Sequence, residues 1–191
     1  MTQFKVLYET DTSELCAALE RNSDLWNSIN NRTLSDSPHR DAPDIWVRYN
    51  AYSNLKENPA TFNDPHIPVW YPAWGRLPEL KPIVFDLMNF VQGEILGGVL
   101  ITKVPAGKKV YPHNDYGWHV SYYDKFYIQL DGANGCNFCV ENADGSIEKF
   151  CPKKNQVYLF DNRLKHWVDN DSDTDRITLI VCIRTQMFGR S

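Results

Sequence analysis

The second half of the chain alternates short apolar segments with glycine-containing turns, and this pattern constrains the fold more than any other feature. Glycine after Asp or Asn favours the tight turns that join antiparallel strands. Regularly spaced short strands predict a β-sandwich or jelly roll. The segments span residues 98–104, 124–131, 136–141, 146–150, 155–160 and 175–183, and the turns include Asp131-Gly132, Asn134-Gly135 and Asp144-Gly145.

The first half predicts helices and loops around this β core. Leu15, Ala18 and Leu19 recur at helical spacing after the capping residues around Thr12, and an apolar stripe from Ile83 to Gln92 follows Pro82. At 191 residues the length fits one domain. We expect residues 1–96 to supply helices, loops and one strand, and residues 97–183 to form the core with the metal site. The other expected elements are a surface loop over 27–45, a strand over 45–49 and a proline-rich connection over 51–81.

One motif in the core carries potential metal ligands. In Tyr111-Pro112-His113-Asn114-Asp115 an imidazole and a carboxylate are one residue apart. On a β-strand, side chains at positions i and i+2 leave the same face. With the distant His166, they would form the facial triad of two His and one carboxylate that holds non-haem Fe(II) and leaves positions open. The motif therefore predicts an iron site.

A single cation begins the last apolar segment, Arg176-Ile177-Thr178-Leu179-Ile180-Val181. This segment predicts a buried strand, where an unpaired charge is costly and needs a partner. Arg176 and Thr178 share a face, so both could bind one carboxylate, the arginine through two hydrogen bonds. The dicarboxylate 2-oxoglutarate would supply that group. Together with iron, this combination predicts an oxygenase.

The distal part of the core resembles the aspartyl/asparaginyl β-hydroxylase family. The likeness lies in the apolar strand ending in Phe160-Asp161, in His166 followed by Trp167-Val168, in the acidic turn, and in Arg176 entering a hydrophobic strand. Residues 98–107, before Pro112-His113-Asn114-Asp115, resemble the family's first core strand and its turn into the metal motif. The resemblance covers residues 97–183. It implies a double-stranded β-helix, or cupin-like jelly roll, that uses Fe(II), 2-oxoglutarate and O2 to hydroxylate an unactivated C–H bond.

Two positions bear on how this chain would fit the family. Where many relatives have Arg-x-His on the strand after the metal motif, this chain has Lys125-Phe126-Tyr127. Lys125 and Tyr127, together with Thr102, are therefore the expected further contacts of the cosubstrate. Some relatives bind iron with two His alone, whereas this chain keeps the carboxylate of Asp115. The acid places it nearer the members that act on small substrates.

Several residues next to the predicted ligands are expected to flank the substrate pocket. His119 would lie at its mouth, or replace a ligand if the site were a three-His cupin. His39 and His66 lie in polar or proline-rich surroundings and receive no predicted role. The expected pocket residues are Tyr111, Tyr116, Trp118, His119 and Trp167.

Each of these residues also has an ordinary structural interpretation. His113 and Asp115 fit a polar turn, His166 a partly buried structural histidine, and Arg176 a surface ion pair with one of the nearby acids. Four separate coincidences are then needed, whereas the iron site explains all four residues together. Two other functions stay open as alternatives: a non-catalytic cupin-like binding or sensor module, and a metal cupin that does not use 2-oxoglutarate.

Composition narrows the partners and the compartment. The formal net charge is −4, so no basic field favours nucleic acid or an anionic membrane. No apolar run is long enough to span a bilayer, and the amino terminus does not look like a signal peptide. The five cysteines lack a disulfide-framework spacing, which predicts a reducing, cytoplasmic location. The expected substrate is an amino acid, a small metabolite, or a peptide or protein side chain.

Overall fold

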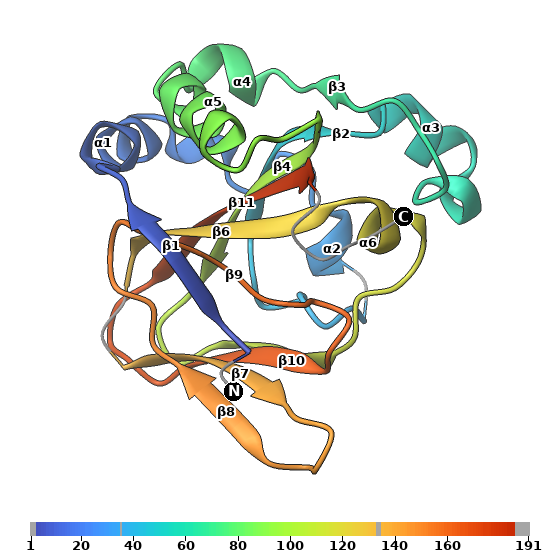
Figure 1. Cartoon of the computed structure of the whole chain (residues 1–191). Coiled ribbons are helices and arrows are strands. Elements are labelled where there is room, and N and C mark those ends of the chain that lie inside the picture. Colours follow the sequence, from blue (N-terminus) through green and yellow to red (C-terminus); the bar gives the residue numbers. More distant parts are fainter. Residues whose placement is uncertain (1–2, 35, 133–134, 186–191) are drawn as a thin grey trace.

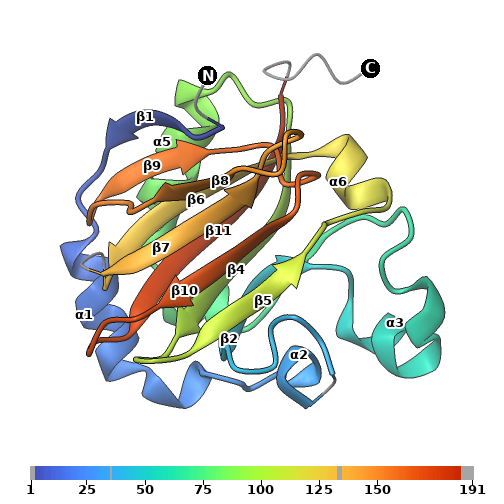
Figure 2. The same cartoon turned by 90° about the horizontal axis from the view of Figure 1, so that it is seen from below.

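Two antiparallel β-sheets face each other in the computed structural model, and helices cover the outer face of the larger sheet (Figures 1 and 2). The structure describes residues 3–34, 36–132 and 135–185. The larger sheet has the order β1 (Lys5–Glu9), β9 (Gln156–Leu159), β6 (Asp124–Asp131), β11 (Arg176–Arg184), β4 (Ile95–Val104), β2 (Asp44–Tyr49) and β3 (Val69–Trp70). The smaller sheet has the order β5 (Lys109–His113), β10 (His166–Asn170), β7 (Cys136–Glu141) and β8 (Ile147–Phe150).

The helices lie mainly in the first half of the chain. Figure 1 shows α1, α4 and α5 above the larger sheet, on the side away from β7 and β10. None of the helices in the described ranges is long and apolar enough to cross a membrane. The helices are α1 (Ser13–Arg21), α2 (Asn31–Leu34), α3 (Tyr52–Glu57), α4 (Ala73–Arg76), α5 (Leu80–Phe90) and α6 (Trp118–Tyr122), with the 3₁₀ turns η1 (Ser23–Leu25) and η2 (Pro59–Thr61).

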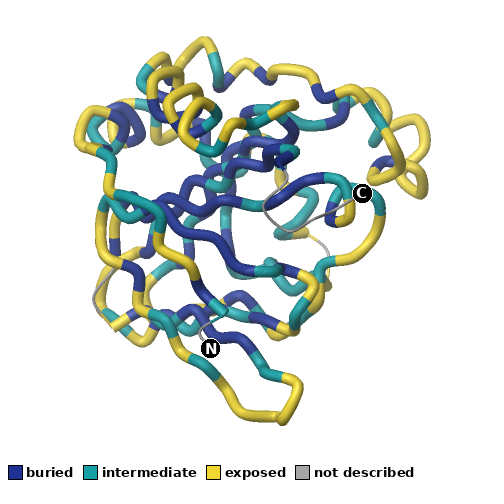
Figure 3. The backbone as a smooth tube through the Cα atoms, viewed as in Figure 1, coloured by how far each residue is buried: buried dark blue, intermediate teal, exposed yellow. Residues whose placement is uncertain are grey.

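Two apolar clusters hold these layers together. The first joins α1 and α5 to the larger sheet, and the second fills part of the space between the two sheets. Both follow from alternation: one face of each central strand carries apolar side chains toward the helices, while the other faces the smaller sheet. Figure 3 shows that the buried segments concentrate in the central strands. The second cluster includes Phe138, Val140, Tyr158, Phe160 and Val168.

The predicted mainly β jelly roll with flanking helices is confirmed, and the six predicted strands of the second half correspond to β4, β6, β7, β8, β9 and β11. The sequence did not predict β1 or β10, because polar residues at their ends (Lys5 and Glu9; His166, Asp169 and Asn170) leave each with only a short apolar segment. The loop expected over 27–45 contains α2, and the connection over 51–81 contains α3, η2, β3 and α4. Pro82 lies at the third position of α5, still in the first turn, where backbone N–H groups have no partner within the helix. The turn expected at Asn134-Gly135 lies partly outside the described residues.

Candidate metal centre and its cavity

Three side chains, two of them from paired strands, converge between the two sheets. His113 is the last residue of β5 and His166 the first of β10, and the two are direct partners in the antiparallel pairing. Asp115 lies two residues beyond the end of β5, and its backbone N–H donates to the Asn162 carbonyl at 3.3 Å. One ligand atom from each of His113, Asp115 and His166 lies within 4.8 Å of the others. The expectation that His113 and Asp115 share one strand is therefore corrected: the strand ends at His113, yet the carboxylate still reaches the site.

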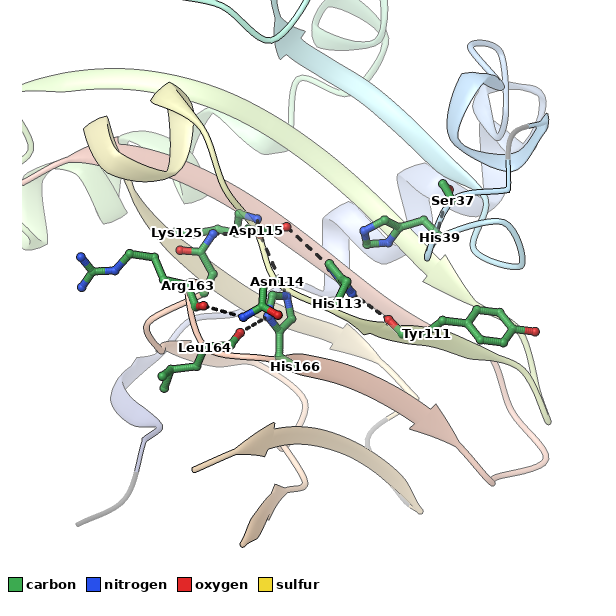
Figure 4. Close-up of polar contacts among 11 residues, drawn as sticks. Ser37, His39, Tyr111, His113, Asn114, Asp115, Lys125, Arg163, Leu164 and His166 are labelled. Atoms are coloured by element: carbon green, nitrogen blue, oxygen red, sulfur yellow. Dashed lines mark hydrogen bonds and ion pairs between the residues drawn. The ribbon is translucent and has the colours of Figure 1, made fainter. Parts of the chain in front are cut away.

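Backbone hydrogen bonds fix the orientation of both imidazoles (Figure 4). The Nδ1 atom of His113 lies 2.7 Å from the Tyr111 carbonyl oxygen, and that of His166 lies 2.8 Å from the Leu164 oxygen. A carbonyl oxygen can only accept, so Nδ1 carries the proton in each ring. Each Nε2 then keeps its lone pair and faces Asp115, at 3.6 Å from Oδ1 for His113 and 4.0 Å from Oδ2 for His166. Such an arrangement is typical of histidine metal ligands.

The protonation states at this centre also fit a metal. Burial lowers the pKa of His113, and it lowers that of His166 to about 4, so both rings are neutral at pH 7. Burial alone would raise the pKa of Asp115. The charge and hydrogen bond of Lys125, the neighbouring His166 and the 2.8 Å bond from Asn162 outweigh this effect and hold it below its usual value. Two lone pairs and one carboxylate are what a divalent cation requires.

The cavity beside this centre has a volume of about 730 Å³, and adjacent strands of the larger sheet form its floor. Thr102 of β4 is the direct partner of Thr178 of β11, and Arg176 lies two residues before Thr178 on the same face. Cys182, six residues along β11 from Arg176, pairs with Lys125 of β6. Arg176 and Lys125 therefore lie at opposite ends of the floor, with the triad above them on β5 and β10.

The Arg176 end presents a buried cation and little to neutralise it. Arg176 is 2% exposed, and one of its terminal nitrogens donates to the Tyr158 hydroxyl at 2.9 Å. Its Nε atom and the Thr102 hydroxyl have no hydrogen-bond partner, and Arg176 has no carboxylate partner within the described ranges. The nearest acid in sequence, Asp175, lies within ion-pair distance of Lys103 instead. A bound carboxylate would satisfy both unpartnered atoms, so this end fits one end of a dicarboxylate.

Sequence comparison now identifies the family. A profile described as aspartyl/asparaginyl β-hydroxylase matches residues 69–185, which is more than half of the chain. The chain belongs to this family. The predictions of family, of a 2-oxoglutarate-dependent hydroxylase and of Fe(II) and 2-oxoglutarate as its cofactors are thereby confirmed. A comparison with curated proteins finds no match.

Solved structures of 2-oxoglutarate oxygenases share the fold. A 2OG-Fe(II) oxygenase family oxidoreductase from Burkholderia pseudomallei superposes with a TM-score of 0.65 and 14% identity, covering 95% of this chain and 84% of the other. A Trichoplax adhaerens prolyl hydroxylase, in complex with a hypoxia inducible factor peptide fragment, superposes with a TM-score of 0.63 and 13% identity, covering 96% of this chain and 84% of the other. HygX from Streptomyces hygroscopicus, with nickel, 2-oxoglutarate and hygromycin B bound, superposes with a TM-score of 0.53 and 13% identity, covering 99% of this chain and 85% of the other.

Within this hydroxylase fold, three expected cosubstrate contacts line the cavity but interact with other side chains. Lys125 bonds the Asp115 carboxylate, because its position on β6 faces Cys182 rather than Arg176. The ring of Tyr127 is 4% exposed and stacks on Tyr158 at 5.4 Å, midway along the floor. The Thr178 hydroxyl donates to the Gln129 side-chain oxygen at 3.2 Å. Thr178, Tyr127 and Thr102 all line the cavity. The Thr102 hydroxyl has no hydrogen-bond partner among the described residues, so it is available to a bound cosubstrate.

Four of the five expected substrate-pocket residues lie in the cavity wall. Trp118 and His119, on α6, line the cavity. Tyr116 borders it but is 90% exposed, and Trp167 borders it with its indole N–H donating to Asp169. The ring of Tyr111 is not part of the cavity wall in the described residues, because its hydroxyl donates to Asp41 at 3.0 Å on the outer side. His119 is not one of the three clustered ligands, so the structure gives no support to a three-His site.

The sequence missed His39. The segment around it covers the free edge of β5, where the Tyr111 N–H donates to the Pro38 carbonyl at 2.8 Å. This contact places the His39 ring 4.8 Å from that of His113, edge to face, in the wall of the cavity (Figure 4). Burial lowers the pKa of His39 well below its usual value. A lone histidine in a polar loop gives no sequence signal for this position.

Proposed function

We propose that this hydroxylase binds Fe(II) through His113, Asp115 and His166, and the far carboxylate of 2-oxoglutarate through Arg176 and Thr102. The observation that carries the proposal is the buried Arg176 without a carboxylate partner among the described residues, in the same cavity as three converging ligand atoms. Either feature alone has structural explanations. Their occurrence in one cavity is what a metal-chelated dicarboxylate needs.

Iron and 2-oxoglutarate, when bound, supply the oxidising chemistry: one oxygen atom of O2 enters succinate as CO2 leaves, and the other enters a substrate C–H bond. The chain's own residues provide the setting. Lys125 and Asn162 orient the Asp115 carboxylate, and the backbone carbonyls of Tyr111 and Leu164 orient the two imidazoles. The two sheets bury the site and limit access of water, which strengthens each of these polar contacts.

The substrate class remains part of the proposal. The neighbours include a prolyl hydroxylase with a peptide and HygX with hygromycin B, so the fold accommodates both kinds of ligand. A volume of about 730 Å³ suits 2-oxoglutarate together with a small molecule or one side chain of a peptide. No nucleic-acid partner is proposed, in keeping with the net charge of −4. A cytoplasmic location also stays a prediction.

Turnover of 2-oxoglutarate tests the proposed function. We expect purified protein with Fe(II) and O2 to convert 2-oxoglutarate slowly to succinate even without substrate, and Asp115→Ala to lose this conversion. Asn114→Ala is the matched control, because Asn114 lies between the ligands but its side chain donates to the Arg163 carbonyl outside the centre. If succinate formation does not require iron, or persists unchanged in Asp115→Ala, the metal assignment is wrong. The metal cupin that uses no 2-oxoglutarate would give iron binding without succinate.

A further inference from the structure

Two imidazoles in the cavity wall serve neither the triad nor the Arg176 end. His39 lies in the segment that covers β5, and His119 lies on α6. Both line the cavity, and each has a buried ring nitrogen without a hydrogen-bond partner among the described residues: Nδ1 of His39 and Nε2 of His119. A buried polar atom without a hydrogen-bond partner costs free energy. Such atoms in a cavity wall therefore indicate that a bound ligand supplies the missing hydrogen bonds.

The local packing directs these rings to the substrate side of the centre. The His39 ring packs edge to face against His113. The His119 ring lies 5.2 Å from that of Tyr49 and passes over Gly98, where an added Cβ would come within 3.4 Å of Nε2. Both imidazoles lie close enough to Asp115 and Lys125 to respond to their charges, and His39 also lies near Arg32. A molecule in contact with both rings would therefore lie beside the triad.

The two imidazoles themselves are uncharged. Neither forms an ion pair within the described ranges, and burial favours the neutral form of both rings. The two partly buried cations nearby are already paired, Arg32 with Asp44 at 3.0 Å and Lys125 with Asp115. Of the other charged residues in the wall, Asp64 is exposed, and Arg48 stacks over Trp70 and donates to the Leu96 carbonyl, with no carboxylate partner among the described residues.

Each neutral imidazole offers one donor and one acceptor, which suits a group that does both. Amides and hydroxyls have this property; carboxylates only accept and ammonium groups only donate. The remaining wall is aromatic, with Trp46, Tyr49, Phe62 and Trp118, and suits the apolar part of the same molecule. The ammonium group of a free amino acid would meet no buried carboxylate without a partner in the described part of this wall, since Asp115 pairs with Lys125 and Asp64 is exposed.

We propose that His39 and His119 form the substrate-recognition site and that they bind an uncharged amide or hydroxyl group, so that a zwitterionic amino acid is not the substrate. This inference rests on the proposed function for the place of the substrate beside the metal. The recognition itself depends only on the two imidazoles and the cavity.

Three probes that share one apolar skeleton test the proposal: N-acetyl-leucine methylamide, 4-methylpentane-1,2-diol and leucine. The ring ¹⁵N resonances of His39 and His119 would be followed in protein loaded with Zn(II) and 2-oxoglutarate, and again in metal-free protein. We expect the amide or the diol to shift both histidines and leucine to leave them unchanged. Whichever of these two uncharged probes binds more tightly shows whether the natural substrate presents an amide or a hydroxyl to the two histidines.

Substitutions then separate hydrogen bonding from packing. His39→Phe and His119→Phe keep a ring but lose the polar atom, and each should weaken binding of the preferred probe about tenfold, the effect of one lost hydrogen bond in a buried site. His39→Asn and His119→Gln restore a polar atom near the positions of Nδ1 and Nε2 respectively. Each should recover most of the lost affinity for the preferred probe. His66→Phe is the matched control, because the His66 ring packs near His119 but does not line this cavity.

The outcomes distinguish this inference from the proposed function. If Zn(II) fails to bind but the amide or diol still shifts both histidines, the metal assignment falls and the recognition site stands. If Zn(II) and 2-oxoglutarate bind but leucine shifts the histidines more than the uncharged probes, the inference is overturned. The same holds if the Phe variants bind the preferred probe as tightly as the His66→Phe control.

Discussion

The two ends of the cavity are built in different ways. The Arg176 end consists of strand residues: Arg176 and Thr178 on β11, and Thr102 opposite on β4. The other end consists of loop and helix residues, His39 beside β5 and His119 on α6, which only the tertiary fold brings together. The first end carries a charge for an anionic cosubstrate, and the second carries neutral imidazoles. We therefore propose that sheet residues bind the cosubstrate and that loop and helix residues bind the substrate.

The largest expected effect comes from removing the carboxylate between the two ends. Asp115→Ala would lose one of three ligands and leave Lys125 without its partner. Because changes to groups that merely support a ligand cost up to about a hundredfold in metal affinity, we expect loss of the ligand itself to exceed this. Fe(II) or Zn(II) binding, measured by equilibrium dialysis under anaerobic conditions, checks the prediction. Affinity within tenfold of wild type would assign the site to two His alone.

Removing the cation should affect the cosubstrate end only. Arg176→Met keeps an apolar stem but loses the guanidinium, and we expect 2-oxoglutarate to bind roughly a hundredfold more weakly, because a carboxylate would then be buried without its partner. Metal affinity and binding of the uncharged probes should stay unchanged. Arg163→Met is the control, since Arg163 is exposed and pairs with Asp161 away from the cavity floor. Equal weakening in both variants would contradict the role of Arg176.

Lys125 tests where the boundary between the two ends lies. The sequence placed it with the cosubstrate, whereas the structure places it on Asp115. We therefore expect Lys125→Met to lower metal affinity by about ten- to hundredfold, in line with a residue that supports a ligand, and to leave 2-oxoglutarate binding unchanged. Isothermal titration of each ligand into the variant measures both quantities. A selective loss of 2-oxoglutarate binding would show that Lys125 contacts the cosubstrate, as the sequence predicts.

The smallest effect concerns the imidazole end and its pH dependence. Burial lowers the pKa of His119 from 6.5 to about 3, so below about pH 6.5 the unfolded chain binds a proton that the folded chain does not. This difference makes the free energy of unfolding fall as the pH decreases toward about 3, while it has no effect above about 6.5. In metal-free protein, His119→Phe should therefore show a shallower loss of stability between about pH 6.5 and pH 5 than wild type. Urea unfolding at several pH values tests this, and identical slopes would show that His119 titrates normally.

The same contrast explains what could be predicted from the sequence. Alternation along a strand places Arg176 and Thr178 on one face without knowledge of the tertiary fold, and the family motif marks His113, Asp115 and His166. The role of Lys125 depends on strand register, since only its pairing with Cys182 separates it from Arg176. His39 depends on the covering of a sheet edge by a loop, a contact with no local sequence pattern. The hydrogen bond from the Tyr111 hydroxyl to Asp41 likewise joins residues far apart in the sequence and has no local pattern.

The most direct test of the central claim is anaerobic titration of Fe(II)-loaded protein with 2-oxoglutarate, in wild type and in Arg176→Met. Chelation of iron by the cosubstrate gives a weak visible charge-transfer band. A band in wild type that requires about a hundredfold more 2-oxoglutarate in the variant is the predicted result, because it links the triad and Arg176 through one ligand. No band at saturating iron and 2-oxoglutarate, or the same titration curve in both proteins, would contradict the account.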